Sequence, residues 1–261
     1  MTEHQGPGVL SERRGAVLII TLDRPARRNA VDSVTSYAVD ALLRGAEADA
    51  SIGAIVLTGA GDRAFCSGMD LKEAALSGVG GGLIPGRGFC GITEVPCRKP
   101  LLAAVNGAAV AGGFEICLAC DLIVASETAV FGLPEVARGM VAFTGGVQRL
   151  ARGLPRAAAM EFILGGGYLP AARLQELGLV NRVVPQEKVL EATLVLADQV
   201  LANSWHALRH AKALYEDARE MSLPDAIAHG HAQAAALMHS AASREGIAAY
   251  AEGRAARFDK A

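Results

Sequence analysis

Short apolar runs alternate with helix-like segments through the first 185 residues, a pattern typical of an α/β fold. Apolar runs of strand length occupy residues 9–14, 16–22, 52–58, 101–105, 121–125 and 180–184, and the first two predict a hairpin around Gly15. Helices are predicted at residues 33–47, 114–120, 156–164 and 173–177. Three further helices are predicted: one after a tight turn at 64–72, one that runs through 93–95, and one at the end of the segment 136–150. Because helices separate the strands, we expect parallel pairing in the core.

Beyond about residue 187 the strand-like runs disappear, and Ala-rich helical sequence continues to residue 260. We therefore expect an α/β core over residues 1–195 and a C-terminal helical subdomain over residues 196–261. This helical tail is richer in apolar residues than a surface helix requires, which suggests that it packs between subunits. No tandem repeat is visible in the sequence.

Residues 77–91 contain seven glycines and one proline, which predicts a mobile surface loop that forms part of a substrate pocket. Within them, residues 86–91 formally match G-x-G-x-x-G. The dinucleotide-binding form of this motif requires a preceding strand and a surrounding βαβ unit, and both are missing from the sequence pattern. We interpret the match as chance.

Composition excludes several classes of protein. The 261 residues are 51% hydrophobic and carry a formal net charge of −2, so no basic excess indicates a nucleic-acid partner. The N-terminus is polar up to Ala16, which disfavours a secretory signal, and no stretch approaches the roughly 18 apolar residues of a membrane span. Five cysteines, an odd number, fit free thiols in a reducing compartment. We expect a soluble, cytoplasmic protein without a membrane partner.

The stretch 101–135 contains the first candidate for chemistry. Gly112 and Gly113 precede residues 114–120, which are apolar on every side at helical spacing except for Glu115. A helix that is apolar all round is normally buried, so Glu115 should lie in the interior near the start of its helix. Because burying an unpartnered carboxylate is costly, Glu115 is either paired structurally or retained for chemistry. The free N–H groups of the helix start favour negative charge, as acyl chemistry requires.

Other chemical motifs are weakly supported. Cys117 and Cys120 form C-x-x-C inside an apolar helix, without a second pair or a nearby histidine, so two buried small residues are a better interpretation than a zinc or redox site. The histidine pairs at 206 and 210 and at 229 and 231 lack neighbouring ligand motifs, and we expect no metal site. No G-x-S-x-G motif is present, and no histidine lies between residues 5 and 205, which argues against a Ser-His or Cys-His nucleophile.

Carboxylates remain as candidates. Glu135 directly follows Pro134 in an apolar stretch. Glu115 likewise lies in an apolar stretch, two residues after the Gly112-Gly113 pair. Two acids in apolar surroundings can hold different protonation states, one serving as acid and the other as base. By spacing alone the pair could also be accidental, because carboxylates are common.

Several motifs follow one another along the chain: AFCSGMDLK at 64–72, NGAAVAGGFE at 106–115, FGLPE at 131–135 and GGVQRL at 145–150. With RPARRNA at 24–30 and LGLVNRVVP at 177–185, they closely resemble the crotonase, or enoyl-CoA hydratase/isomerase, family. The resemblance runs from about Gly15 to Phe258 and implies a spiral core of repeated ββα units with a C-terminal helical subdomain. It does not select one reaction, because the family includes hydratases, isomerases, dehalogenases, hydrolases and decarboxylases.

The resemblance also implies roles for individual residues. The backbone N–H groups of Met69 and Gly112 would form an oxyanion hole for the thioester carbonyl oxygen as it gains enolate charge. Glu115 and Glu135 match the two glutamates of hydratases, of which the first activates a water and the second transfers the Cα proton. Relatives that only isomerise double bonds or hydrolyse thioesters commonly lack one of the two.

Having both glutamates favours reversible hydration of a 2-enoyl-CoA to a 3-hydroxyacyl-CoA. Double-bond isomerisation or another dehydration on the same scaffold is the alternative, and a non-catalytic CoA-ester-binding scaffold is a third. The resemblance implies no permanently bound cofactor, with coenzyme A as part of the substrate.

Coenzyme A contacts and assembly follow from the same resemblance. Lys72 matches a position that contacts CoA phosphate, and Ser67 lies where backbone carbonyls meet the adenine. Arg27 and Arg28 form either phosphate contacts or a solvated charge cluster. Phe258 resembles a residue that reaches the CoA site of a neighbouring subunit, since family members commonly form trimers or hexamers of two trimers with their C-terminal helices at the contacts.

Residues 142–144 depart from the family pattern, and one of these departures matters. Hydratases typically carry Pro-Gly-Ala-Gly-Gly before Gln-Arg-Leu, whereas this chain has Ala-Phe-Thr-Gly-Gly at 142–146. Phe143 therefore replaces a glycine that lies beside the catalytic water. We expect its bulk to narrow the acyl pocket, to reorient the water or to favour a different substrate.

Overall fold

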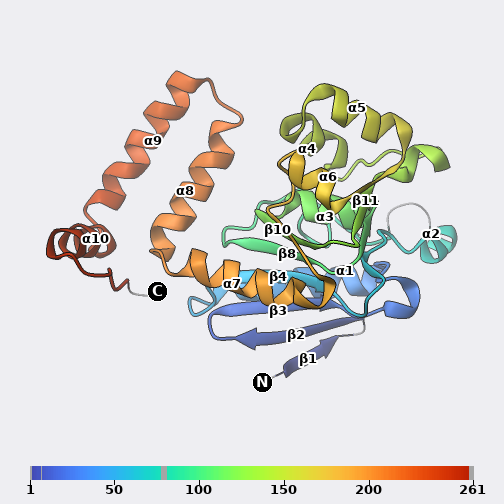
Figure 1. Cartoon of the computed structure of the whole chain (residues 1–261), viewed down its shortest axis with the longest axis horizontal. Coiled ribbons are helices and arrows are strands. Elements are labelled where there is room, and N and C mark those ends of the chain that lie inside the picture. Colours follow the sequence, from blue (N-terminus) through green and yellow to red (C-terminus); the bar gives the residue numbers. More distant parts are fainter. Residues whose placement is uncertain (1, 7, 78–80, 259–261) are drawn as a thin grey trace.

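Two β-sheets form the centre of the computed structural model, which describes residues 2–6, 8–77 and 81–258 (Figure 1). The larger sheet has the strand order β1-β2-β3-β4-β8-β10-β13. The predicted hairpin is confirmed as the antiparallel pair β2–β3, and from β3 onward neighbouring strands pair in parallel, as expected. The strands are Thr2–Gly6 (β1), Val9–Arg14 (β2), Val17–Leu22 (β3), Ala54–Gly59 (β4), Leu101–Val105 (β8), Leu122–Ser126 (β10) and Arg182–Val184 (β13).

The smaller sheet, in the order β12-β11-β9-β5, packs against the larger one through a shared apolar cluster. Its strands are Ala64–Cys66 (β5), Ala108–Val110 (β9), Val130–Gly132 (β11) and Tyr168–Pro170 (β12). Each of the successive pairs β4–β5, β8–β9 and β10–β11 sends its first strand to the larger sheet and its second to the smaller one. A helical segment follows each pair: α2 (Leu71–Ser77), α3 (Gly112–Ala119) and η2 (Pro134–Arg138). The expected spiral of ββα units is thus confirmed.

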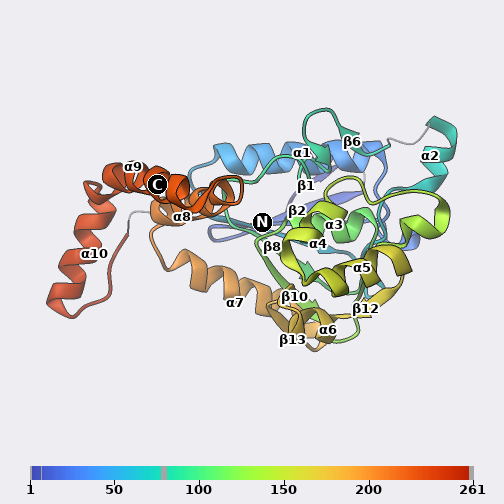
Figure 2. The ribbon, with the colours of Figure 1, turned by 90° about the horizontal axis from the view of Figure 1, so that it is seen from above.

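The central strands of the larger sheet are buried on both faces. Because successive side chains of a strand point to opposite faces, Ile20 and Ile55 join the cluster under α1 (Ser33–Ala48) and the smaller sheet, whereas Ile19 and Val56 join the cluster under α7 (Val189–Leu201). Figure 2 shows α1 and α7 on opposite sides of the sheet. Burial on both faces explains why these strands read as continuous apolar runs.

The C-terminal third is helical, as expected. Helix α7 belongs to the core, and the expected domain boundary at 195/196 falls inside it. Trp205, at the start of α8, also packs on the core, since a Cβ on Gly53 would lie 2.6 Å from its ring. Beyond that contact, α8 (Trp205–Ala218), α9 (Leu223–Met238) and α10 (Ala241–Glu252) extend away from the sheets (Figure 1).

Two expectations are wrong for the described residues. Residues 93–95 form a bend rather than a helix, and Thr93 is buried with its Oγ1 accepting the N–H of Phe89 at 2.8 Å. Residues 81–91, expected to be a mobile surface loop, contain the short hairpin β6 (Leu83–Ile84) and β7 (Gly88–Phe89). The expectation for residues 78–80 lies outside the described residues.

The glycines of this hairpin serve its geometry. Gly82, Gly86, Gly88 and Gly91 all have positive φ, a conformation that glycine adopts without steric cost. The hairpin is tied to α1 by an ion pair to a buried carboxylate, in which the half-buried Arg87 donates from Nε to Asp40 Oδ1 at 2.5 Å. A glycine count therefore did not distinguish a surface loop from a hairpin, because these glycines permit tight turns around buried contacts.

The remaining elements are α4 (Gly146–Gly153), α5 (Arg156–Gly165), α6 (Ala171–Glu176), η1 (Pro25–Arg27) and η3 (Gln186–Lys188). All five cysteines are free thiols. Burial raises the pKa of Cys66 to about 12, which keeps this thiol protonated and unreactive. No helix of the described residues is long and apolar enough to cross a membrane.

Candidate active site

A cavity of about 120 Å³ opens where the start of α3 meets the turn before α2 and residues 134–144. It brings together most of the site residues predicted from sequence: Ser67, Met69, Gly112, Glu115, Glu135 and Phe143. The rest of the lining is Leu71, Leu83, Phe89, Val110, Ala111, Pro134, Arg138, Met140, Val141 and Thr144. Most of this lining is apolar, and two carboxylates and one guanidinium supply its charge.

The two predicted oxyanion donors border the cavity from adjoining loops. Gly112 is the first residue of α3, so its N–H precedes the helix's own ladder of hydrogen bonds. Neither this N–H nor that of Met69 takes part in the turn and loop hydrogen bonds of the described residues. A Cβ on Gly68 would lie 3.0 Å from the nitrogen of Gly112, so the loops touch here. Ala111, with φ 53° and ψ −127°, is strained and turns the chain into α3.

Glu115 is buried at 4% exposure, as predicted, and both of its carboxylate oxygens are held. Oε1 accepts the backbone N–H of Gly146 at 2.9 Å, and Oε2 accepts the hydroxyl of Thr144 at 2.5 Å. The sequence left open whether this acid is paired structurally. Its partners are a hydroxyl and a backbone N–H, which compensate part of the cost of burial and leave the acid in the cavity wall.

Glu135 is the second residue of η2 and is 8% exposed. Burial raises its pKa to about 7, and the nearby charge of Glu115 adds to the rise, although a backbone hydrogen bond and Arg138 oppose it. Its Oε2 atom has no hydrogen-bond partner among the described residues. Near neutral pH this acid therefore populates both protonation states, with one oxygen free for a ligand.

Two contacts hold the donor and acid segments together. The Phe89 ring packs on Gly112, where a Cβ would lie 2.7 Å from Cε1 of the ring. Arg149 of α4 donates to the carbonyl of Thr93 at 2.8 Å and so ties α4 to the hairpin that carries Phe89. Sequence reasoning missed these residues, because each acts through a partner far away in the chain.

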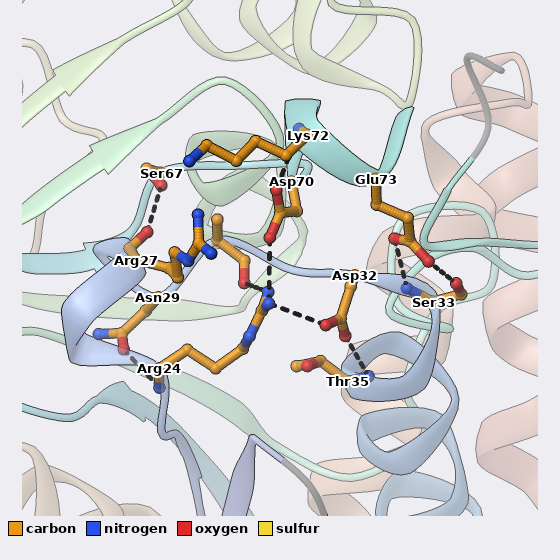
Figure 3. A network of polar contacts seen from close by, with 11 residues as sticks. Arg24, Arg27, Asn29, Asp32, Ser33, Thr35, Ser67, Asp70, Lys72 and Glu73 are labelled. Carbon is orange, nitrogen blue, oxygen red and sulfur yellow. Dashed lines mark hydrogen bonds and ion pairs between the residues drawn. The ribbon is translucent and has the colours of Figure 1, made fainter. Parts of the chain in front are cut away.

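Three of the predicted CoA-binding residues, Ser67, Lys72 and Arg27, lie beside a polar network near the start of α2 (Figure 3). Ser67 donates to the carbonyl of Arg27 at 3.5 Å. The Lys72 side chain extends toward the side of Ser67 and Arg27 and is exposed, outside the cavity lining. Arg24, in contrast, pairs with Asp32 at 2.9 Å and with Asp70 at 3.0 Å, which fixes the turn that carries Met69. The sequence analysis did not single out Arg24.

The remaining predicted residues have different surroundings. Phe143 lines the cavity and is 51% exposed, so its ring stands at the opening rather than in the interior. Arg28 is the left-handed C-cap of η1, with φ 52°. Phe258 lies outside the cavity of its own chain, and its ring is near Gly246 of α10.

Two cavity residues, Arg138 and Thr144, were missed by sequence reasoning. Arg138 comes three residues after Glu135, and Thr144 follows the unusual Phe143 directly. The sequence could have suggested them only through their closeness to the predicted residues Glu135 and Phe143. The structure is needed to show that both side chains border the cavity.

Comparisons with known proteins agree with this geometry. The model of the enoyl-CoA hydratase/isomerase family matches residues 12–261. A probable enoyl-CoA hydratase of Rhizobium meliloti is 39% identical over 96% of this chain and 97% of its own length. A carnitinyl-CoA dehydratase of Proteus mirabilis is 38% identical over 81% of each chain. The crystal structure of an enoyl-CoA hydratase from Mycobacterium tuberculosis superposes with a TM-score of 0.92 at 41% identity, covering 98% of this chain and all of that one.

Proposed function

Because the chain belongs to the enoyl-CoA hydratase/isomerase family, we propose that it catalyses the reversible hydration of a 2-enoyl-CoA to a 3-hydroxyacyl-CoA. The main observation in support is that the two carboxylates of one cavity differ in their hydrogen-bond partners. Glu115 has both oxygens held by donors, whereas Glu135 has a free oxygen and a pKa of about 7. Acids with such different surroundings are suited to separate roles.

The thioester carbonyl oxygen would accept hydrogen bonds from the N–H groups of Met69 and Gly112, which stabilise the enolate charge. Glu115 then takes a proton from water as its hydroxyl adds to Cβ, and Glu135 gives its proton to Cα. In the reverse direction Glu135, ionised, removes the Cα proton, and the hydroxyl leaves Cβ with the proton returned by Glu115. Each direction restores the starting protonation of the pair after exchange with solvent.

The cavity supports a short, uncharged acyl group. At about 120 Å³ it is somewhat smaller than the roughly 150 Å³ cavity that holds a benzene molecule. A carnitinyl group carries a permanent trimethylammonium cation, and Arg138 in the lining would repel it. Glu115 and Glu135 do not serve as counter-ions for that cation in this mechanism, because both are assigned to proton transfer. We therefore prefer a neutral enoyl thioester over the carnitinyl substrate of some relatives.

Coenzyme A would lie along Ser67, Lys72 and Arg27, with no permanently bound cofactor. Lys72 and Arg27 are exposed, and Figure 3 shows the Lys72 side chain extending toward Ser67 and Arg27. Ser67 itself lines the cavity. We further propose a trimer, or a hexamer of two trimers, in which Phe258 approaches the neighbouring subunit's CoA. The exposed apolar residues of the projecting helices, Tyr215, Leu223, Ile227, Ile247 and Tyr250, support assembly through this region.

The test is turnover of crotonyl-CoA and longer 2-enoyl-CoA esters, with product mass measured. Hydration adds one water to the mass, whereas isomerisation leaves it unchanged. Glu115→Gln and Glu135→Gln should each lower kcat at least about 100-fold, and Glu161→Gln, an exposed glutamate of α5, should not. Wild-type turnover in both active-site variants would refute the mechanism. Tight CoA-ester binding without any product across the panel would favour a non-catalytic scaffold.

A further inference from the structure

Thr144 joins the segment after Phe143 to Glu115. The residue is 5% exposed, and its hydroxyl donates to Glu115 Oε2 at 2.5 Å, across 29 positions of sequence. Threonine hydroxyls in loops usually bond to backbone groups a few residues away. This one instead reaches an acid on another element, in the wall of the cavity.

The backbone around Thr144 is fixed on its C-terminal side. Gly145 has φ 105°, and a Cβ at this position would collide with the guanidinium of Arg149. The next residue, Gly146, donates its N–H to the other oxygen of Glu115 at 2.9 Å. The hydroxyl donor therefore lies two residues before a second donor to the same carboxylate, so both oxygens of Glu115 are held by one segment.

A carboxylate held at one oxygen can still rotate, whereas one held at both oxygens keeps a fixed plane. We propose that Thr144 is a positioning residue for hydration, whose hydroxyl fixes the plane of the Glu115 carboxylate toward the attacking water. The hydroxyl proton stays on Thr144 throughout, and the proton from water goes to Glu115. This inference rests on the proposed function, because it assigns the water-activating role to Glu115.

A purely structural role predicts a different outcome. Removing the hydroxyl leaves Oε2 of Glu115 buried with one donor fewer, which costs stability in either case. Only a positioning role also lowers kcat at unchanged KM, because the thioester carbonyl would be held by Met69 and Gly112 while the Thr144 hydroxyl donates to Glu115. Misorientation of a catalytic group by a fraction of an ångström is enough to slow a reaction about 10-fold or more.

The first experiment compares steady-state hydration by Thr144→Val and Thr144→Ser. The valine variant keeps the shape and loses the hydroxyl, so we expect kcat to fall about 10-fold or more with KM within about twofold of wild type. The serine variant keeps the hydroxyl and should recover most of kcat. Thr193→Val is the matched control, because Thr193 is fully buried in α7 and its hydroxyl bonds only the carbonyl of Val189 at 2.7 Å. It should lower Tm without changing kcat.

A second readout separates Glu115 from Glu135. Exchange of the Cα protons of butanoyl-CoA in D₂O needs Glu135 and the oxyanion donors but no water-activating base. Thr144→Val should leave this exchange rate within about twofold of wild type while hydration falls. Loss of both activities in parallel, or a serine variant as slow as the valine variant, would overturn the positioning role.

A third readout does not depend on hydration. We expect Thr144→Val to lower Tm by a few degrees in the wild-type background and by clearly less in Glu115→Gln, because hydrogen bonds to charged acceptors are the stronger ones. If wild type hydrates no enoyl-CoA, the proposed function fails. The positioning role of Thr144 in hydration then fails as well. The comparison of Tm among wild type, Thr144→Val, Glu115→Gln and the double variant still decides whether the two side chains are coupled. Equal Tm losses in both backgrounds would refute the coupling itself.

Discussion

The ring of Phe89 occupies the space that a side chain on Gly112 would need, since a Cβ there would lie 2.7 Å from Cε1 of the ring. Packing thus requires glycine at 112, and the proposed oxyanion role of its N–H would require the same lack of a side chain. We predict that Gly112→Ala displaces the backbone N–H at this position and lowers kcat/KM about 100-fold or more, the usual effect of losing one oxyanion donor. Steady-state kinetics on the preferred enoyl-CoA measures the effect.

The matched control is Gly45→Ala, in an exposed part of α1 where a Cβ would meet nothing within 4 Å. This change should leave activity intact and raise the free energy of unfolding by up to about 1 kcal/mol, because alanine is the better helix former. Adding Phe89→Leu to Gly112→Ala should recover part of the lost activity. Full activity in Gly112→Ala would mean that this N–H is not an oxyanion donor.

The raised pKa of Glu135, about 7, predicts the same pH dependence for both directions of the reaction. Hydration starts with one proton on Glu135 and dehydration with that proton on Glu115, so the pair carries a single proton in either case. Because the reaction releases no net proton, kcat/KM should fall in both directions as pH rises through about 7 and the pair loses this proton. Rate profiles from pH 5 to 9 in both directions test this. A hydration profile that stays flat through pH 7 would contradict the role of Glu135.

The same group predicts a change in stability. Burial raises the pKa of Glu135 from its ordinary value of 4.5 to about 7, so between these values the folded state binds the proton more tightly than the unfolded chain does. The free energy of unfolding therefore falls as pH rises from about 4.5 to 7. Glu135→Gln should raise it by about 1 to 2 kcal/mol at pH 8 and by little at pH 5. Thermal unfolding at both values measures the difference, and equal effects at both would refute it.

Arg138 should influence both the acid and the choice of substrate. Its positive charge lowers the pKa of Glu135, so Arg138→Leu should move the fall in hydration to higher pH. The same variant should raise kcat/KM for an enoyl-CoA that carries a trimethylammonium group about 10-fold relative to a neutral one. Arg173→Leu, which removes a surface charge paired with Glu176, is the control and should change neither property. Unchanged discrimination in Arg138→Leu would show that this charge does not select the acyl group.

The pair between Arg87 and Asp40 should hold one wall of the cavity in place. Arg87→Met removes a partner of a carboxylate that is 3% exposed and should cost about 2 to 3 kcal/mol of stability. Arg87→Met should also raise KM, because Leu83 and Phe89 of the same hairpin line the cavity. Amide exchange at residues 88–92 should become faster, because the ion pair that ties the hairpin to α1 is lost. Arg44→Met removes the other partner of Asp40 from a 61% exposed site and should cost at most about 1 kcal/mol. Equal effects of the two changes would contradict this assignment.

The sequence predicted the long elements well, because their patterns span enough residues to be distinctive. The runs at 101–105 and 121–125 became strands β8 and β10, and the burial of Glu115 in α3 followed from an apolar surround. The short strands β5, β9 and β11 were not predicted, since three residues carry no periodic signal. They owe their conformation to pairing with strands of neighbouring turns of the spiral, which is a non-local interaction.

The sequence by itself determined the alternation of long strands and helices, the family motifs and the identity of the two acids, because these depend on local pattern and on the order of motifs along the chain. The spiral of ββα units was implied by the family resemblance alone. Only the tertiary structure decided how the two acids differ. Glu115 is held at both oxygens by Thr144 and Gly146, whereas Glu135 has a raised pKa and one oxygen without a partner among the described residues. Hydrogen bonds across 29 or 31 residues and the loss of water around a side chain are properties of the packed chain, which no local stretch of sequence encodes.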